Sequence, residues 1–191
     1  MKLDTHLHEL LTAFRSHVDE FAFVDPSRVM FVAGAARLRS KASIRPLTFG
    51  ARQLSADGRY SKPLIHRRGI AMLYEICLRP AFFLRANGRD RLELLVHELL
   101  HVSHEFDGTL DRNRRHSRLP QNEFAELARP IADEVTRSAP RSIEFLSHRG
   151  EARLAAWLHR PPSLILEGAR ASRTVREYDE NDMYEAIVEM S

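Results

Sequence analysis

Two histidines and a glutamate lie close together in the segment His97-Glu98-Leu99-Leu100-His101. His97 and His101 are four residues apart, so on a helix their imidazoles lie on one face, one turn apart. Such a pair can bind one Zn²⁺ ion through ring nitrogens at about 2.0–2.1 Å. The neighbouring Glu98 can accept a proton from a water on the metal and pass it to a leaving amine. The segment therefore predicts metal-assisted hydrolysis with Glu98 as the catalytic base.

A second segment of the chain begins in the same way but lacks the second histidine. It reads His8-Glu9-Leu10-Leu11-Thr12, so a threonine stands where the second ligand would be. The full pattern at residues 97–101 is specific, because a chain with ten histidines is expected to contain it far less than once by chance. The alternative for residues 97–101 is two histidines on a helix surface that bind nothing. We favour the metal site there and expect none at residues 8–12.

A hydrolytic zinc site needs a third protein ligand and an open fourth position. We favour His116, which follows the expected helix in a loop that is free to fold back. Glu123, on the next expected helix, stays open as the alternative third ligand. His104 is disfavoured, because it lies seven residues after His97, which is about 10 Å along the axis of a straight helix.

The elements that must position these residues can be predicted from hydrophobic spacing. Residues 90–106 are expected to form the metal-binding helix, because Asp90 and Glu93 resemble a capping box and Gly108 is a natural stop. The other expected elements are a helix over residues 3–23, strands over 29–38, 43–49 and 70–78, a helix over 120–138 with a kink at Pro130, and a short helix over 151–159. The pattern of residues 177–191 does not decide between strand and helix.

Length and composition indicate one globular domain. The chain has 191 residues, of which 43% are hydrophobic and 29% charged. Its apolar runs are far shorter than a membrane span, and its N-terminus lacks the layout of a secretory signal, so we expect a cytoplasmic protein with no membrane partner. The single Cys77 excludes an internal disulfide framework and a four-cysteine zinc ribbon. The expected fold class is α+β, with a small twisted mixed sheet, the metal-binding helix and additional helices.

The formal net charge of +3 hides an asymmetry between the body and the end of the chain. Residues 1–176 contain 29 basic and 20 acidic residues, a net of +9. No basic residue follows Arg176, but six acidic ones do, namely Glu177, Asp179, Glu180, Asp182, Glu185 and Glu189. The basic body can attract polyanions, which makes nucleic acid a candidate partner, although such a surface is also typical of a merely solvated one. The acidic tail could dock on the basic body and restrict access to the metal.

Residues 68–126 resemble the SprT-like and phage-type zinc metallopeptidases. Members of these families have a sheet strand, a short turn, a helix carrying His-Glu-x-x-His and a third histidine in the following loop. Fourteen residues separate His101 from His116, a spacing similar to that of the Spartan-type branch of SprT-like proteases. The resemblance implies a zincin-like metallopeptidase domain over residues 1–176, followed by the acidic tail of residues 177–191. It also implies that His97, His101 and His116 bind Zn²⁺ and that Glu98 is catalytic.

Two alternatives to a metalloprotease acting on peptides or proteins stay open. One is a DNA-associated SprT-like protein that acts on DNA-bound proteins, for which a steep salt dependence of DNA affinity is expected. The other is a catalytically silent domain with a structural zinc. A structural site is typically closed by four protein ligands and has no metal-bound water. The sequence indicates neither the substrate nor the oligomeric state.

Overall fold

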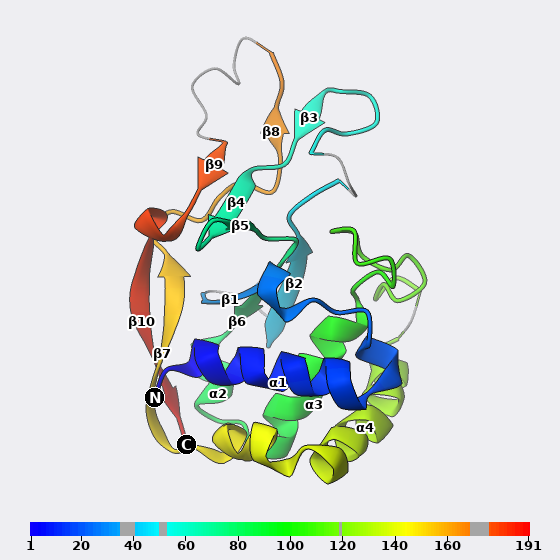
Figure 1. Ribbon diagram of the computed structural model, residues 1–191, viewed down its shortest axis with the longest axis vertical. Coiled ribbons are helices and arrows are strands. Elements are labelled where there is room, and N and C mark those ends of the chain that lie inside the picture. Colours follow the sequence, from blue (N-terminus) through cyan, green and yellow to red (C-terminus); the bar gives the residue numbers. More distant parts are fainter. Residues whose placement is uncertain (35–40, 50–52, 119, 169–175) are drawn as a thin grey trace.

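A computed structural model of the chain describes residues 1–34, 41–49, 53–118, 120–168 and 176–191 (Figure 1). The fold is α+β with several helices, as expected from the sequence, but the described strands form four small sheets rather than one. The helices are α1 (Leu3–His17), α2 (Pro80–Phe83), α3 (Gly88–Leu100) and α4 (Gln121–Ser138). The strands are β1 (Val29–Ala33), β2 (Ala42–Pro46), β3 (Tyr60–Ser61), β4 (Leu64–Arg67), β5 (Ile70–Ala71), β6 (Tyr74–Leu78), β7 (Gly150–Trp157), β8 (Ile165–Leu166), β9 (Glu177–Tyr178) and β10 (Met183–Met190).

A three-stranded mixed sheet lies at the centre of the molecule, in the order β1-β6-β2. The middle strand β6 runs parallel to β1 and antiparallel to β2. Every residue of β1 and β6 is buried, which is typical of strands covered on both faces. Strand β2 is an edge strand, because β6 is its one paired neighbour in the described part of the chain. The expected strand over residues 70–78 is divided into β5 and β6.

Helices α1 and α3 cover one face of this sheet (Figure 1). Their apolar side chains meet Phe31 of β1 and Ile76 of β6 in the main core, with Leu7 from α1 and Leu95 from α3 among them. The opposite face of the sheet packs against a smaller cluster that contains Trp157 at the end of β7. Helix α4 packs beside α3 and extends the main core. Both faces of the sheet are therefore buried, while the edge of β2 is left for other contacts.

The expected helix over residues 151–159 is wrong, because these residues belong mainly to β7. Strand β7 pairs with β10 in an antiparallel ladder of eight residue pairs. Ala152, Leu154 and Ala156 are buried and alternate with more exposed residues, which is the period of a strand. The segment is rich in good helix formers, but the pairing with a distant strand overrides this weak local preference. The acidic end of the chain accordingly contributes β9 and β10.

The limits of two expected helices also differ from the structure. Helix α1 ends at His17 rather than at residue 23, because Val18 has extended backbone angles and a 3-10 turn follows. Helix α3 begins at Gly88, where the Asn87 side chain accepts a hydrogen bond from the backbone N–H of Asp90 at 2.9 Å. The supposed capping partner Glu93 instead forms an ion pair with Arg89 at 2.7 Å. Asn87 is therefore the N-cap of the metal-binding helix.

The remaining expected elements agree more closely with the structure. Strands β1 and β2 correspond to the expected strands over residues 29–38 and 43–49, of which residues 35–38 lie outside the described residues. Helix α4 corresponds to the expected helix over residues 120–138 and continues through Pro130. Within the ranges that the structure describes, no helix has the length and apolar character needed to cross a membrane.

Candidate metal centre

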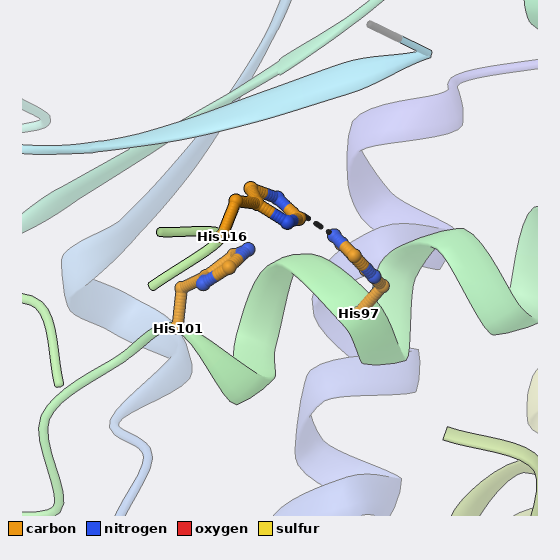
Figure 2. Close-up of side chains that lie close together, drawn as sticks. All are labelled: His97, His101 and His116. Carbon is orange, nitrogen blue, oxygen red and sulfur yellow. Dashed lines mark hydrogen bonds between the residues drawn. The ribbon is translucent and has the colours of Figure 1, made fainter. Parts of the chain in front are cut away.

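Three imidazoles converge at the C-terminal end of α3. His97 lies in the last turn of this helix, His101 is its C-cap residue, and His116 comes from the loop that precedes α4 (Figure 2). One nitrogen of each ring lies within 4.8 Å of the others, and the Nε2 atoms of His97 and His116 are 3.4 Å apart. Two nitrogens bound to one tetrahedral zinc ion are separated by about 3.3–3.4 Å. The three histidines expected as ligands are thus brought to a spacing that fits a metal ion.

The two other candidate ligands lie outside this cluster of described residues. Glu123 is an exposed residue in the first turn of α4. His104 does not lie on α3, because the helix ends at Leu100, and its imidazole instead packs against the ring of Phe23 with centroids 4.8 Å apart. Its Nε2 atom is 3.8 Å from a carboxylate oxygen of Glu20.

The loop between His101 and His116 is folded back on itself. Val102 and Leu110 form an antiparallel bridge, and the Asp111 N–H donates to the His101 carbonyl at 2.8 Å. This pairing ends α3 at Leu100 instead of at residue 106, because the Ser103 N–H donates to the carbonyl of Thr109 at 3.1 Å, across the loop rather than along a helix. It also returns the chain toward the end of α3, where His116 meets the helical pair.

Tyr74 of β6 attaches this loop to the central sheet. Its hydroxyl donates to the carbonyl of Thr109 at 2.8 Å and accepts the backbone N–H of Gly108 at 3.0 Å. Burial raises the pKa of Tyr74, so the hydroxyl stays protonated and keeps both hydrogen bonds. Gly108 is required here, since its φ is +84° and a Cβ atom would lie 1.8 Å from the Thr48 hydroxyl. Thr48 donates in turn to the carbonyl of Asp107 at 3.0 Å.

The orientation of His101 is set by a backbone carbonyl. Its Nδ1 atom lies 2.5 Å from the carbonyl oxygen of Arg114. Because a carbonyl can only accept, Nδ1 carries the proton and Nε2 keeps its lone pair for a metal. The guanidinium of Arg114 pairs with Glu20 at 2.5 Å, in the turn that follows α1. Glu20 therefore supports His101 through Arg114, in the way that residues around a metal site commonly orient its ligands.

A phenylalanine ring packs against all three histidines. Phe124 of α4 is fully buried, and its ring centroid lies 4.6 Å from those of His97 and His101 and 5.0 Å from that of His116. Burial, and secondarily the neighbouring histidines, lowers the pKa of His97 to about 4. Burial also lowers the pKa of His101. At neutral pH both imidazoles are therefore uncharged, which is the form that binds a metal.

Glu98 follows His97 on α3 and is buried, with 5% of its surface exposed. Burial raises its pKa to about 7, and a hydrogen bond from the backbone of Ile44 in β2 opposes this rise. A carboxyl group whose pKa lies near the working pH can both accept and return a proton. Glu98 contacts the edge strand β2 and, with His101 and His116, lines the same cleft.

The cleft has a volume of about 970 Å³ and follows the edge of β2. Its wall is made by β2 with residues 48, 49 and 62, and by residues 160–163 after β7. The loop between His101 and His116, here called the ligand loop, adds residues 107, 109, 110, 112 and 115, and His116 itself. No residue of the acidic tail lines it, so the expectation that the tail covers the metal site is not supported. The tail is instead paired with β4 and β7.

Several residues of the site and its surroundings were missed from the sequence. No role at the histidines was predicted for Phe124 or Glu20, because both lie outside residues 97–116 and reach the site through the tertiary fold. Glu75 did give a signal, since it is a single carboxylate within the apolar strand over residues 70–78. In the structure Glu75 is completely buried and accepts hydrogen bonds from Arg45, Trp157 and Arg160 at 2.7–2.9 Å.

Comparisons with known protein families, with characterised proteins and with solved structures give no match for this chain. The resemblance to SprT-like and phage-type metallopeptidases therefore stays a prediction from the sequence. The residues that carry that resemblance do meet in space, as the geometry of the three histidines demonstrates.

Proposed function

We propose that this protein is a zinc-dependent metallopeptidase of the zincin type, which hydrolyses peptide bonds. His97, His101 and His116 hold the metal in this proposal, and Glu98 is the general base. The observation that carries it is the convergence of three imidazoles at an open cleft that is lined by His101, His116 and the buried Glu98. The resemblance of residues 68–126 to SprT-like metallopeptidases supports the same assignment.

The donor set favours zinc over magnesium and calcium. Imidazole nitrogens suit Zn²⁺, whereas Mg²⁺ and Ca²⁺ prefer oxygen ligands. Three protein ligands with an open fourth position are typical of catalytic zinc. The chemistry that zinc supplies when bound is that of a Lewis acid, which polarises a carbonyl group and makes water more acidic.

Glu98 performs the proton transfers in this proposal. Its carboxylate accepts the proton of the attacking water, and the resulting carboxyl group donates it to the nitrogen of the departing amine. Both steps use the same group, which requires a pKa between those of the two partners and close to neutral pH. The buried position of Glu98 beneath β2 supplies the necessary rise.

The edge of β2 supports a peptide as the substrate. An extended peptide can add to an exposed sheet edge through main-chain hydrogen bonds, while its side chains enter neighbouring pockets. Strand β2 has such an edge, and the cleft with Glu98, His101 and His116 follows it. A peptide paired with β2 would therefore run past both the base and two of the proposed ligands.

The geometry argues against a purely structural zinc. A structural site is usually closed by four protein ligands. Among the residues with described positions, three donors form the cluster, and His116 is exposed on the side of the cleft. This arrangement favours a metal that meets a substrate.

The proposal is tested by measuring the metal content of the purified protein together with its peptidase activity. We expect one zinc per chain and cleavage of a quenched fluorescent peptide library. Chelation should remove the activity, and added zinc should restore it. A chain that binds no zinc, or whose peptidase activity survives chelation, would refute the assignment.

A further inference from the structure

The cleft beside the metal centre is lined by an excess of basic side chains. Five basic residues contribute to its wall, namely Arg45, Lys62, Arg112, Arg115 and Arg160. The acidic residues of the wall are Glu98 and Asp107. The Oδ1 atom of Asp107 already accepts hydrogen bonds from the backbone and hydroxyl of Thr109 at 3.0 and 2.6 Å. The positive charge of the wall is therefore largely unneutralised from within the cleft.

Two of the basic groups are fixed in place from behind by one buried carboxylate. Glu75 of β6 accepts a hydrogen bond from Arg45 at 2.7 Å and one from Arg160 at 2.9 Å. Arg45 also donates to the carbonyl of Pro161 at 2.8 Å. One negative charge thus holds two positive ones, which leaves a net positive charge on this side. Such a prearranged pair loses little side-chain freedom when a ligand binds.

The opposite side of the cleft carries two basic residues without acidic partners. Arg112 and Arg115 come from the ligand loop and are exposed. Neither forms an ion pair with any carboxylate in the part of the chain that the structure describes. By contrast, Arg114 between them is held by Glu20. Arg112 and Arg115 are therefore available to a ligand that lies in the cleft.

Lys62 extends the positive surface toward the far end of β2. Its ammonium group donates to the carbonyl of Pro46, the last residue of β2, at 3.1 Å. Burial, and secondarily the charge of Arg45, lowers its pKa. Basic groups thus lie along β2 as well as across from it.

We propose that the cleft selects extended peptide segments rich in Asp and Glu, which pair with β2 while their carboxylates bind Arg112, Arg115 and Arg160. This inference rests on the proposed peptidase function and names its substrate class. Guanidinium groups bind carboxylates through short charge-assisted hydrogen bonds, often two at a time. The acidic tail of the chain does not fill this position, because it is paired with β4 and β7.

The shape and composition of the cleft favour a peptide over a nucleic acid. Single-stranded nucleic acid is typically bound by aromatic rings on which successive bases stack. The one phenylalanine of the wall, Phe49, is partly buried and lies beneath Lys62, whose ammonium is 5.2 Å from its ring centre. The edge of β2, in contrast, can pair with an extended peptide, apart from the Ile44 backbone group that bonds Glu98 and the Pro46 carbonyl that accepts from Lys62.

Binding can be measured without turnover by using the zinc-loaded Glu98→Gln variant. The probes are two fluorescein-labelled dodecapeptides, one alternating Glu with Val and the other alternating Gln with Val. We expect the Glu peptide to bind at least about tenfold more tightly by fluorescence anisotropy, as for the loss of one charge-assisted hydrogen bond. The preference should decline steeply as salt is raised, because exposed charges are screened.

Further substitutions in the Glu98→Gln variant identify the residues that cause the preference for the Glu peptide. Arg112→Gln, Arg115→Gln and Arg160→Gln should each reduce it about three- to tenfold, as expected for lost charge pairs. Arg118→Gln is the matched control, because Arg118 is an exposed residue of the same loop that does not line the cleft, and the preference should be unchanged. Zinc content is measured for every variant, which separates a lost ligand contact from a damaged metal site.

The result that would overturn this inference is equal, or undetectable, binding of the Glu and Gln peptides. It would also be overturned if single-stranded or duplex DNA bound through Arg112 and Arg115 while the peptides showed no charge preference. Cleavage of the Glu and Gln peptides at equal rates by the wild type would leave the peptidase assignment intact and refute the charge selection. Selective binding of the Glu peptide without cleavage of any peptide would support the charge selection and refute the peptidase assignment.

Discussion

Helices α1 and α3 contain nearly the same five-residue segment, but the polar side chains of the two segments have different neighbours. The segment His8-Glu9-Leu10-Leu11-Thr12 lies on α1, and His97-Glu98-Leu99-Leu100-His101 lies at the end of α3. In both segments the two leucines are buried in the main core. The comparison therefore isolates what turns a common helical pattern into a metal site.

On α1 the polar residues are already satisfied by local contacts. Both ring nitrogens of His8 lie beside backbone carbonyls, that of Asp4 at 2.8 Å and that of Val29 at 3.0 Å. The Glu9 side chain is 60% exposed and lies 3.1 Å from His6. Thr12 donates its hydroxyl hydrogen to the carbonyl of His8 at 2.9 Å. No nitrogen of this segment is left for a metal.

On α3 the same residue types face one another and a third histidine. His97 lies opposite His116, His101 keeps one nitrogen unprotonated, and Glu98 is buried under an edge strand. In the proposed site the helix supplies two ligands and the base, while the folded loop supplies the third ligand. The loop and the edge strand, more than the helical pattern, therefore distinguish the candidate metal site on α3 from the segment on α1.

The largest expected effect comes from the two glutamates. Glu98→Gln should reduce peptide turnover by about 10²–10⁴-fold, the usual contribution of a general base, while zinc stays bound. Glu9→Gln is the matched change on α1 and should leave turnover unaltered. Turnover of a fluorogenic peptide and zinc content are measured on both variants. Full activity of Glu98→Gln would show that the assigned base is wrong.

Measurements of zinc affinity distinguish His116, the proposed third ligand, from the two alternative residues. His116→Ala should weaken zinc binding by more than about 100-fold, beyond the effect typical of residues that merely support a site. Glu123→Ala and His104→Ala should leave the affinity unchanged, because both side chains lie outside the cluster. Competition with a colorimetric zinc chelator gives the three values. A larger loss in Glu123→Ala than in His116→Ala would contradict the proposed ligand set.

Glu98 and Glu9 should also differ in how they affect the stability of the metal-free protein. Below pH 4.5 the Glu98 carboxyl is protonated whether the chain is folded or unfolded. Between pH 4.5 and 7 the unfolded chain loses this proton while the folded chain retains it, so stability falls over this range and stays low above it. Replacement by Gln removes that loss. Between pH 4.5 and 8 the free energy of unfolding of the variant should therefore rise by about 3 kcal/mol relative to that of the wild type.

Urea unfolding of the metal-free proteins at several pH values measures this gain. Glu9→Gln is again the control, because its side chain is exposed and its replacement should give no comparable trend with pH. A difference between Glu98→Gln and wild type that stays constant with pH would mean that the carboxyl is not held in a costly buried position.

A smaller effect is expected from the residue that supports His101 through Arg114. Glu20→Gln removes the charge that holds the Arg114 guanidinium, and zinc affinity should fall about tenfold. Glu105→Gln, an exposed change in the ligand loop, should have no effect. The same chelator competition is used. Unchanged affinity in Glu20→Gln would show that the Arg114 carbonyl is held by the loop alone.

The smallest expected effect concerns the segment on α1. Thr12→His completes the His-Glu-x-x-His pattern there, yet it should add no second zinc to the chain. The reason is that both nitrogens of His8 face backbone carbonyls, and the nearby carboxylate of Asp4 is held by Arg67. Zinc stoichiometry after dialysis measures this. A second bound zinc would show that the helical pattern is sufficient by itself.

Features that depend on nearby residues could be predicted from the sequence. The hydrophobic period located α1, α3 and α4, and the metal-binding pair followed from a spacing of four residues on one helix. The loop histidine could be chosen because a straight helix cannot bring a third ligand to the same ion. Each of these inferences needs only the local geometry of one segment.

Features that depend on distant partners could not be predicted. The sequence of β7 favours a helix, and its strand form depends on pairing with β10, some thirty residues later. The end of α3 depends on a loop that Tyr74 holds from β6. Phe124 and Glu20 reach the site from α4 and from the turn after α1. Nothing in their own neighbourhoods marks them.

Two adjacent residues of the central strand β6 have separate roles because the strand is pleated. Side chains of neighbouring strand residues project to opposite faces, so Tyr74 holds the ligand loop on one face while Glu75 anchors Arg45 and Arg160 on the other. A shift of β6 by one residue would exchange these two side chains between the faces. Retention of the metal and the charge presented to a substrate would then fail together, so both depend on a single strand register.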